Sequence, residues 1–316
     1  MSVSVLIPTF KRPEGLKRAL TSLAQQTTKA DEIVVVGSAR DGSARAACDA
    51  IAAQHEIAPI VFIEAPEPGV SNARNAGFAA AKGRFVAQLD DDESASPEWL
   101  SALLQAREAL SAGVVFGPVE PEVQAAGAVR AAFCGRLYAR RGPAEDRRID
   151  APFGCGNSLI DRAEAVLPAL PFDPRANEMG GEDDILFARL RAAGIAFGWA
   201  AQARVTEHVD PERARMGAML RRAFAFGQGP SQTCAAERDR LGVGRWMTIG
   251  AGQALVFGLL AAPARLTGAR RAAYCLDKAA QGAGKLVWGD FAAPRFYGRA
   301  ESFDAVAAKS TQDSVF

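Results

Sequence analysis

A run of three aspartates is the first group of residues whose types and spacing could do chemistry. Asp90, Asp91 and Asp92 follow the apolar segment 85–89, which is typical of a buried strand. Carboxylates at the end of a buried strand cost free energy unless cations accompany them. Two of them one residue apart can place oxygens on a divalent ion that also holds a diphosphate. The alternative is a solvated acidic loop ahead of a helix near Pro97.

A second acidic group opens a helical pattern much later in the chain. Gly180 and Gly181 precede Glu182 and Asp183, and a helix is predicted over 182–193. Acidic side chains are favourable at a helix N-terminus, and this alone would explain them. Because a carboxylate is ionised at neutral pH, Asp183 could also accept a hydroxyl proton without the help of a histidine.

An arginine and a histidine could act together with these acids. Arg74 lies in the segment 69–77, where a turn leads into a helix, and it can meet an anionic group through two N–H donors. The alternative for this segment is a capped surface helix. His208 follows a short strand pattern at 203–205, and its neutral imidazole is either a metal ligand or a hydrogen-bonded structural residue. The other histidine, His55, is expected on a helix surface.

The elements that must position these residues alternate along the first ninety residues. The predicted strands are 3–7, 32–36, 60–63 and 85–89, and the predicted helices are 12–26, 43–55 and 71–81. This alternation indicates an α/β fold with a mainly parallel central sheet flanked by helices. Ligands of such sheets bind beyond the carboxyl ends of the strands. The loops 8–10, 37–41 and 90–92 are therefore expected to meet in one crevice.

The second half of the chain is less regular. A helix is predicted to begin with Ser96 as its N-cap and Pro97 at its first position. The other predicted elements are strands at 113–119 and 156–160 and helices at 182–193 and 212–227, ahead of a polar tail at 300–316. We expect a catalytic domain over 1–230 and a helical C-terminal extension over 231–316.

Composition and charge narrow the range of partners. The chain has 37 Lys and Arg residues against 36 Asp and Glu, so its net charge of +1 gives no general attraction to nucleic acid. Its five cysteines form no CxxC pair, which favours buried reduced thiols over a zinc ribbon or a disulfide framework. The N-terminus lacks a basic stretch followed by an apolar one, so a strand is expected there rather than a signal peptide.

One apolar segment suggests contact with a membrane. Residues 246–264 contain no charged side chain, and Arg245 precedes them, while Arg265, Arg270 and Arg271 follow. The length is near the lower limit for crossing a bilayer, and three glycines and a proline weaken it further. The segment predicts a membrane-surface or re-entrant helix, with a buried soluble helix and a true span as alternatives.

The order of these features resembles that of glycosyltransferase family 2, whose members have the GT-A fold. The matching segments are 5–12 (Val-Leu-Ile-Pro-Thr-Phe-Lys-Arg), 69–77, 88–92 and 181–183. The resemblance implies a nucleotide-sugar donor, with a UDP-sugar first among them, and Mg²⁺ or Mn²⁺ as the cofactor. It also implies a saccharide acceptor, as in bacterial exopolysaccharide and cell-wall transferases.

The resemblance also implies roles for individual residues. Asp183 would be the catalytic base, and Glu182 would help to orient the sugar or the acceptor. Asp92 would bind the metal with the diphosphate, and His208 would be a further metal ligand. Asp90 would face the nucleotide ribose, and residues 154–158 would lie near the acceptor. The donor-binding residues are expected to be Pro8, Thr9, Phe10, Arg12, Asp41, Arg74, Asp90 and Asp91.

One position departs from the family pattern. Relatives usually carry an acidic residue at the end of the second strand to hold the base, whereas this chain has Gly37 there. Asp41 is the candidate substitute. The donor is accordingly a UDP-sugar, a GDP-sugar or another activated sugar.

The expected reaction is an inverting displacement at the anomeric carbon, on a lipid-linked saccharide at the cytoplasmic face of the cell membrane. A nucleotidyltransferase acting on sugar phosphates is one alternative, but such enzymes usually open with a Gly-rich basic loop where this chain has Pro-Thr-Phe-Lys-Arg. A catalytically silent membrane-surface scaffold is another, and the presence of Asp183 together with the aspartate triplet disfavours it.

Overall fold

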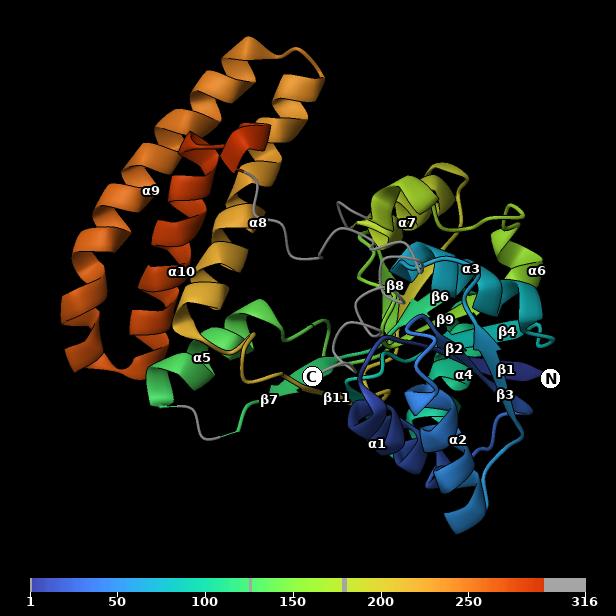
Figure 1. Ribbon diagram of the computed structural model, residues 1–316. Helices are drawn as coiled ribbons and strands as arrows, with labels where there is room; N and C mark the ends of the chain where they lie inside the picture. The colour runs from blue at the N-terminus through green and yellow to red at the C-terminus, as the bar shows by residue number, and fades with distance from the viewer. Residues whose placement is uncertain (1, 125–126, 178–180, 293–316) are drawn as a thin grey trace, which may run out of the picture. The chain divides into compact units, whose positions relative to one another are not determined.

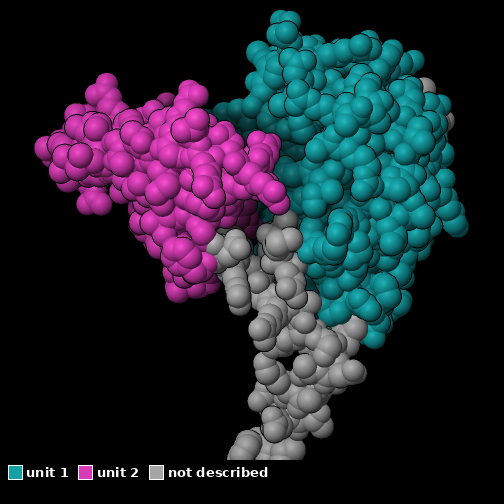
Figure 2. Space-filling view, turned by 90° about the horizontal axis from the view of Figure 1, so that it is seen from above, with its two compact units in different colours: residues 1–120, 140–208, 297–316 teal, residues 121–139, 209–296 magenta. Residues whose placement is uncertain are grey.

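The computed structural model describes residues 2–124, 127–177 and 181–292, so Gly180 and the tail 300–316 lie outside the described residues. The chain divides into two compact units, coloured separately in Figure 2. Unit 1 comprises 1–120, 140–208 and 297–316, and unit 2 comprises 121–139 and 209–296. The last change from unit 1 to unit 2 among the described residues comes after residue 208. The predicted domain boundary at residue 230 stays a prediction.

An eight-stranded sheet forms the centre of unit 1 (Figure 1). Its order is β3-β2-β1-β4-β9-β6-β10-β8. The strands are β1 (Val3–Thr9), β2 (Glu32–Gly37), β3 (Ile60–Glu64), β4 (Phe85–Gln88), β6 (Val114–Phe116), β8 (Arg147–Ile149), β9 (Ser158–Asp161) and β10 (Phe197–Trp199). The first four run parallel, with Leu6 of β1 opposite Val34 of β2 and Gln88 of β4. The mainly parallel sheet is thus confirmed, with β9 inside it and β8 at its edge running antiparallel to their neighbours.

Successive side chains of the parallel strands point to opposite faces of the sheet and pack into two separate hydrophobic cores. Val5 and Ile7 of β1 pack with α1 (Pro13–Ala24), α2 (Ser43–Gln54) and α4 (Trp99–Leu110). Leu6 points the other way and packs with α3 (Val70–Ala80) and α7 (Glu182–Ala192). This alternation follows from the two-residue period of a strand. Apolar runs such as 3–7 and 32–36 are therefore continuous because both faces of the sheet are covered.

A second sheet, of three strands, begins directly after the aspartate triplet. Its order is β5-β11-β7, where β5 is Glu93–Ala95, β11 is Val205–His208 and β7 is Val119–Glu122. β5 starts directly after Asp92 and pairs antiparallel with β11, with Glu93 opposite Glu207. His208, at the end of β11, is thereby brought next to the triplet.

Two sequence predictions in this region are wrong. Helix α4 begins at Trp99 with Glu98 as its N-cap, not at Ser96. The reason is that the backbone N–H of Ser96 still donates to the carbonyl of Arg204 (2.9 Å), so this residue continues the pairing of β5. The single strand expected over 113–119 is two strands, β6 and β7, interrupted at Gly117. A Cβ on Gly117 would lie 2.3 Å from the carbonyl oxygen of Ala203.

Apart from the end of β7, unit 2 is helical in its described part. Its elements are α5 (Ala128–Leu137), α8 (Met216–Ala236), α9 (Arg240–Thr267), α10 (Ala269–Leu286) and the short 3₁₀ helix η2 (Asp290–Ala292), with the long helices seen in Figure 1. The helix predicted at 212–227 begins instead at Met216 and extends to Ala236, through Pro230. Glycine lets α8 and α10 pack closely, because a Cβ on Gly284 would lie 2.0 Å from the carbonyl oxygen of Phe224.

Candidate active site

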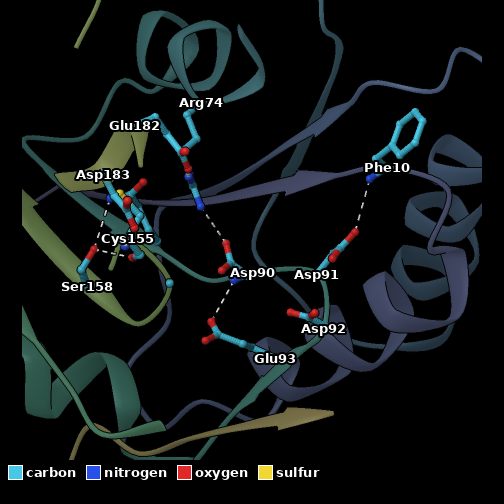
Figure 3. Close-up of polar contacts among 12 residues, drawn as sticks. Phe10, Arg74, Asp90, Asp91, Asp92, Glu93, Cys155, Ser158, Glu182 and Asp183 are labelled. Atoms are coloured by element: carbon cyan, nitrogen blue, oxygen red, sulfur yellow. Dashed lines mark hydrogen bonds and ion pairs between the residues drawn. The ribbon is translucent and has the colours of Figure 1, made fainter. Parts of the chain in front are cut away.

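The aspartate triplet lies just beyond the carboxyl end of β4, in unit 1, and is tied to the loop after β1 (Figure 3). Asp91 accepts hydrogen bonds from Thr9 Oγ1 (2.8 Å) and from the backbone N–H of Phe10 (3.3 Å). Arg12 Nη1 lies 3.1 Å from Asp91 Oδ1 and 2.8 Å from Asp92 Oδ2. The structure therefore brings together the loops that follow the first and fourth strands.

Burial sets the proton affinity of Asp91. Loss of water around its carboxylate, together with the charge of Asp92, raises its pKa to about 6, although Arg12 and Thr9 act to lower it. Asp91 thus supports the loop after β1, and its buried oxygens are already occupied by Thr9, Phe10 and Arg12.

Arg74 connects the two acidic groups that the sequence holds far apart. Its guanidinium is buried on α3, and its Nη2 lies 3.2 Å from Asp90 Oδ1. Its Nη1 forms an ion pair with Glu182 Oε1 at the start of α7. Because one planar guanidinium touches both carboxylates, Asp90 and the Glu182-Asp183 helix start face the same site (Figure 3).

The segment before α7 is fixed to α3 by two asparagines. Asn75 exchanges hydrogen bonds with the backbone of Phe172, donating to its carbonyl (2.8 Å) and accepting from its N–H (2.9 Å). Asn177, in the 3₁₀ helix η1 (Pro174–Asn177), accepts from the N–H of Ser71 in the first turn of α3 (2.8 Å). These bonds place the start of α7 against the helix that carries Arg74.

Asp183 faces the segment that leads into β9. Its Oδ2 accepts from the backbone N–H of Cys155 (3.3 Å), and its Oδ1 accepts from the N–H of Asp184 (2.9 Å). A Cβ on Gly154 would lie 2.9 Å from Asp183 Oδ2, so the backbone comes close here because that residue is glycine. Asp183 is partly exposed, and solvent can therefore reach it.

Glu93 and Arg140 also belong to the site, although neither was predicted from the sequence. Glu93 is buried, and its Oε2 accepts from the N–H of Asp90 (2.9 Å). Burial and the charge of Asp90 hold the pKa of Glu93 well above its usual range, while Arg140 acts against this rise. Arg140 Nη1 donates to the carbonyls of Gly156 and Asn157, the latter at 3.2 Å.

His208 meets the triplet through a backbone hydrogen bond. Its N–H donates to the carbonyl of Asp92 (2.7 Å), and its Nε2 lies 2.8 Å from Ser94 Oγ. In the part of the chain that the structure describes, no group of three or more His, Cys, Asp or Glu side chains is arranged to hold a metal ion. Any ion at Asp92 would therefore need ligands from a substrate or from water.

A small pocket lies at the carboxyl ends of β1, β2 and β3. Among its lining residues are Thr9, Gly37, Asp41, Phe62 and Glu64. A hydrogen bond from the Ser43 hydroxyl lowers the pKa of Asp41. Two residues expected to line a base pocket, Pro8 and Phe10, are not among the lining residues of this one, and Phe10 is 53% exposed.

Comparison with known proteins decides the family. A family model described as glycosyl transferase family 2 matches residues 4–157, which contain the loop after β1, Arg74 and the whole triplet. Residues 4–157 therefore form a glycosyl transferase family 2 domain. The α/β fold with its mainly parallel sheet agrees with the GT-A fold expected for that family.

Relatives with assigned names are glycosyltransferases and polysaccharide biosynthesis proteins. The succinoglycan biosynthesis protein ExoM of Rhizobium meliloti is 29% identical over 231 residues, which cover 72% of this chain and 74% of that protein. The amylovoran biosynthesis glycosyltransferase AmsE of Erwinia amylovora is 36% identical over 99 residues, which cover 30% of this chain and 36% of that protein. The solved structure of S. aureus TarS aligns over 72% of this chain and 40% of that chain, at 18% identity and a TM-score of 0.46.

The donor set of this site fits a hard divalent cation. Six carboxylates line the described site, those of Asp90, Asp91, Asp92, Glu93, Glu182 and Asp183, against the three guanidinium groups of Arg12, Arg74 and Arg140. The carboxylates thus outnumber the guanidinium groups, so the site can accept a further positive charge. Mg²⁺ commonly takes one or two carboxylates and completes its shell with phosphate oxygens and water.

The sequence contained a signal for some of the missed residues but not for others. Glu93 directly follows the triplet, and Glu64 ends the third strand, so both could have been found by extending the strand-end rule. Arg140 lies between elements in an irregular stretch, and nothing local marks it. Only the fold brings it to the carbonyls of Gly156 and Asn157.

The Arg74 ion pairs lead to a stability prediction. Arg74→Met should lower the free energy of unfolding by about 3–5 kcal/mol, because it leaves Glu182 buried without its cation. Chemical denaturation of the purified chain measures this loss. The double variant Arg74→Met with Glu182→Gln should recover part of it, since the uncompensated charge is then gone. Equal stability of wild type and Arg74→Met would show that the ion pair does not form.

Proposed function

We propose that this chain is an inverting, metal-dependent glycosyltransferase that moves a sugar from a nucleotide-diphosphate sugar to a saccharide acceptor. The observation that carries the proposal is the Arg74 guanidinium, which contacts Asp90 on one side and Glu182 on the other. It joins a donor-side carboxylate to the helix start that bears Asp183. In such a displacement the base and the leaving group lie on opposite sides of the anomeric carbon. We propose that Asp183 supplies the base and that the donor diphosphate lies on the side of Asp90.

Each residue of the site has a proposed task. Asp183 accepts the proton of the acceptor hydroxyl as it attacks, and Glu182 orients the sugar or acceptor. Asp90 faces the ribose, and Asp92 would hold Mg²⁺ or Mn²⁺, with His208 beside it. A divalent cation bound there would neutralise the charge that develops on the leaving diphosphate. Gly154 leaves room for the acceptor next to Asp183.

We propose that the base binds at the strand ends over this pocket, whose volume of about 10 Å³ has room for a water molecule but not for a base. Thr9 and Asp41 line it, and Glu64 offers a carboxylate where Gly37 cannot. We propose a UDP-sugar as the donor, with Asp41 or Glu64 accepting a hydrogen bond from the base. Pro8, Phe10 and Arg12 lie in and after β1 beside this pocket, and we propose them as further donor contacts.

The proposed acceptor is a lipid-linked saccharide of exopolysaccharide or cell-envelope synthesis. The named roles of ExoM and AmsE in succinoglycan and amylovoran biosynthesis support this acceptor class. Helix α9 supports work at a membrane, because it is long and apolar enough to cross one and only 11% of its apolar window is buried. We propose that residues 231–316 hold the enzyme to the cytoplasmic face of the cell membrane.

Product analysis tests the proposed reaction. Purified protein is incubated with a panel of nucleotide sugars and a saccharide acceptor, and released nucleoside diphosphate and pyrophosphate are measured separately. A glycosyltransferase releases the nucleoside diphosphate and transfers the sugar. Release of pyrophosphate from a nucleoside triphosphate and a sugar phosphate would instead establish the nucleotidyltransferase alternative. Turnover of none of these substrates would favour the scaffold.

A further inference from the structure

Unit 2 contains a cavity of about 480 Å³ that the transfer reaction does not use. It lies between the last turns of α9, the first turns of α10 and helix α5. The residues that matter for its chemistry are Arg136 of α5, Ala264 and Thr267 of α9, and Arg270, Arg271 and Tyr274 of α10. Its lining thus combines three guanidinium groups with apolar and aromatic surface.

Two of these arginines carry uncompensated charge. Arg270 and Arg271 are exposed, and neither has a carboxylate within ion-pair distance among the described residues. The sequence itself contains no Asp or Glu from 240 to 276, although five arginines lie in that stretch. The positive charges of Arg270 and Arg271 are therefore available to an anionic ligand.

The third arginine is fixed in place as a wall of the cavity. Arg136 Nη2 lies 2.6 Å from Oδ2 of the buried Asp277, and Gln281 donates to the other oxygen of that carboxylate (2.8 Å). The guanidinium of Arg136 also lies over the ring of Tyr274, 4.7 Å from its centroid. These contacts hold the Arg136 side chain in place at the cavity. Arg270 and Arg271 remain available to a ligand.

An exposed apolar stripe on α9 runs toward the cavity. Leu255, Leu259 and Leu266 are 64%, 70% and 91% exposed, and their spacing of four and seven residues places them on one face of the helix. Leu260 lies at the cavity itself. An apolar stripe near Arg270 and Arg271, for which the described residues offer no carboxylate partner, matches a lipid, which has apolar chains below an anionic headgroup.

We infer that this cavity binds the phosphate headgroup of an anionic phospholipid, while the α9 stripe lies among the acyl chains. Arg270 and Arg271 then contact the phosphate, and Arg136 with Tyr274 forms the wall behind it. The inference rests on the proposed membrane association and adds to it a defined headgroup site. The charge complementarity and the absence of acidic residues from 240 to 276 select an anionic lipid over a neutral one.

Cosedimentation of the full chain with vesicles tests this site. Vesicles of phosphatidylcholine alone are compared with vesicles that also contain phosphatidylglycerol, at constant salt. Wild type should prefer the anionic vesicles, and Arg270→Gln with Arg271→Gln should weaken this binding roughly 25-fold, about fivefold for each arginine. Arg221→Gln is the control for charge, because Arg221 is exposed on α8 outside the cavity.

Filling the cavity without changing its charge separates a defined site from general attraction. Ala264→Phe and, independently, Thr267→Phe should both lower binding to the anionic vesicles, with folding checked by circular dichroism. If both filled variants bind as wild type does, the headgroup site is refuted while membrane association stands. If wild type sediments with neither vesicle, or forms a dimer instead, the membrane association itself is wrong. Transfer to a soluble saccharide is measured separately and should be unchanged in all these variants.

Discussion

Replacing Asp183 with asparagine is expected to lower turnover by roughly 100- to 10,000-fold, the usual contribution of a positioned base. Asparagine has one acceptor oxygen, so it can keep the bond from the N–H of either Cys155 or Asp184 and loses the other. The ion pair of Glu182 with Arg74 is unchanged and should hold the start of α7 in place. Asparagine has no carboxylate to take the acceptor proton. Release of nucleoside diphosphate in the presence of acceptor measures turnover, and titration calorimetry with the donor measures binding, which should stay near normal.

The neighbouring residue offers a matched control for this variant. Asp184→Asn changes the same chemical group one position further along α7, where the side chain is exposed and makes no contact with residues 154–156 that the structure records. It should retain most of the turnover. An Asp183→Asn enzyme with full activity would end the assignment of this residue as the base.

Removal of divalent cations is expected to stop transfer, and addition of Mn²⁺ or Mg²⁺ should restore it. The reason is electrostatic: the leaving diphosphate adds negative charge to a site where carboxylates already outnumber guanidinium groups. Without a cation, donor binding and departure of the nucleoside diphosphate are both opposed. The measurement is initial rate against free metal concentration after treatment with EDTA.

The metal role has a control within the chain. Asp92→Asn should raise the metal concentration needed for half-maximal rate, whereas Asp49→Asn, an exposed position on α2, should leave it unchanged. Undiminished rates in excess chelator would reject the metal requirement. The proposed roles of Asp92 and His208 would then have to be abandoned.

The first half of the fold follows from local patterns in the sequence. Segments 3–7 and 32–36 are short, β-branched and apolar, and these properties suffice to specify strands covered on both faces. The direction of β9 could not be predicted in this way, because a four-residue strand does not reveal whether its partners run parallel or antiparallel. The start of α4 was mispredicted for a related reason. The capping signal at Ser96 is local, whereas the backbone bond to Arg204 that overrides it is not.

The candidate site shows the same limit. Asp90, Arg74 and Glu182 were selected by residue type and position, and the structure places them in contact. The contacts among them could not be derived from spacing, since three elements separated along the chain must first pack together. Arg140 illustrates the extreme case, because its place depends entirely on the path of the chain between β7 and β8.

The Arg74 bridge limits how segments can be exchanged between related enzymes. Nearly all proposed donor contacts come from the first ninety-two residues, while Glu182 and Asp183 belong to a later part of the chain. A chimera joined at β9 would combine one parent's nucleotide specificity with another's acceptor specificity. Such a hybrid can work only if the incoming α7 brings an acidic residue for Arg74, because otherwise the guanidinium is left buried with a single partner. Recombination among these transferases is thus restricted by one charge pair rather than by the sheet itself.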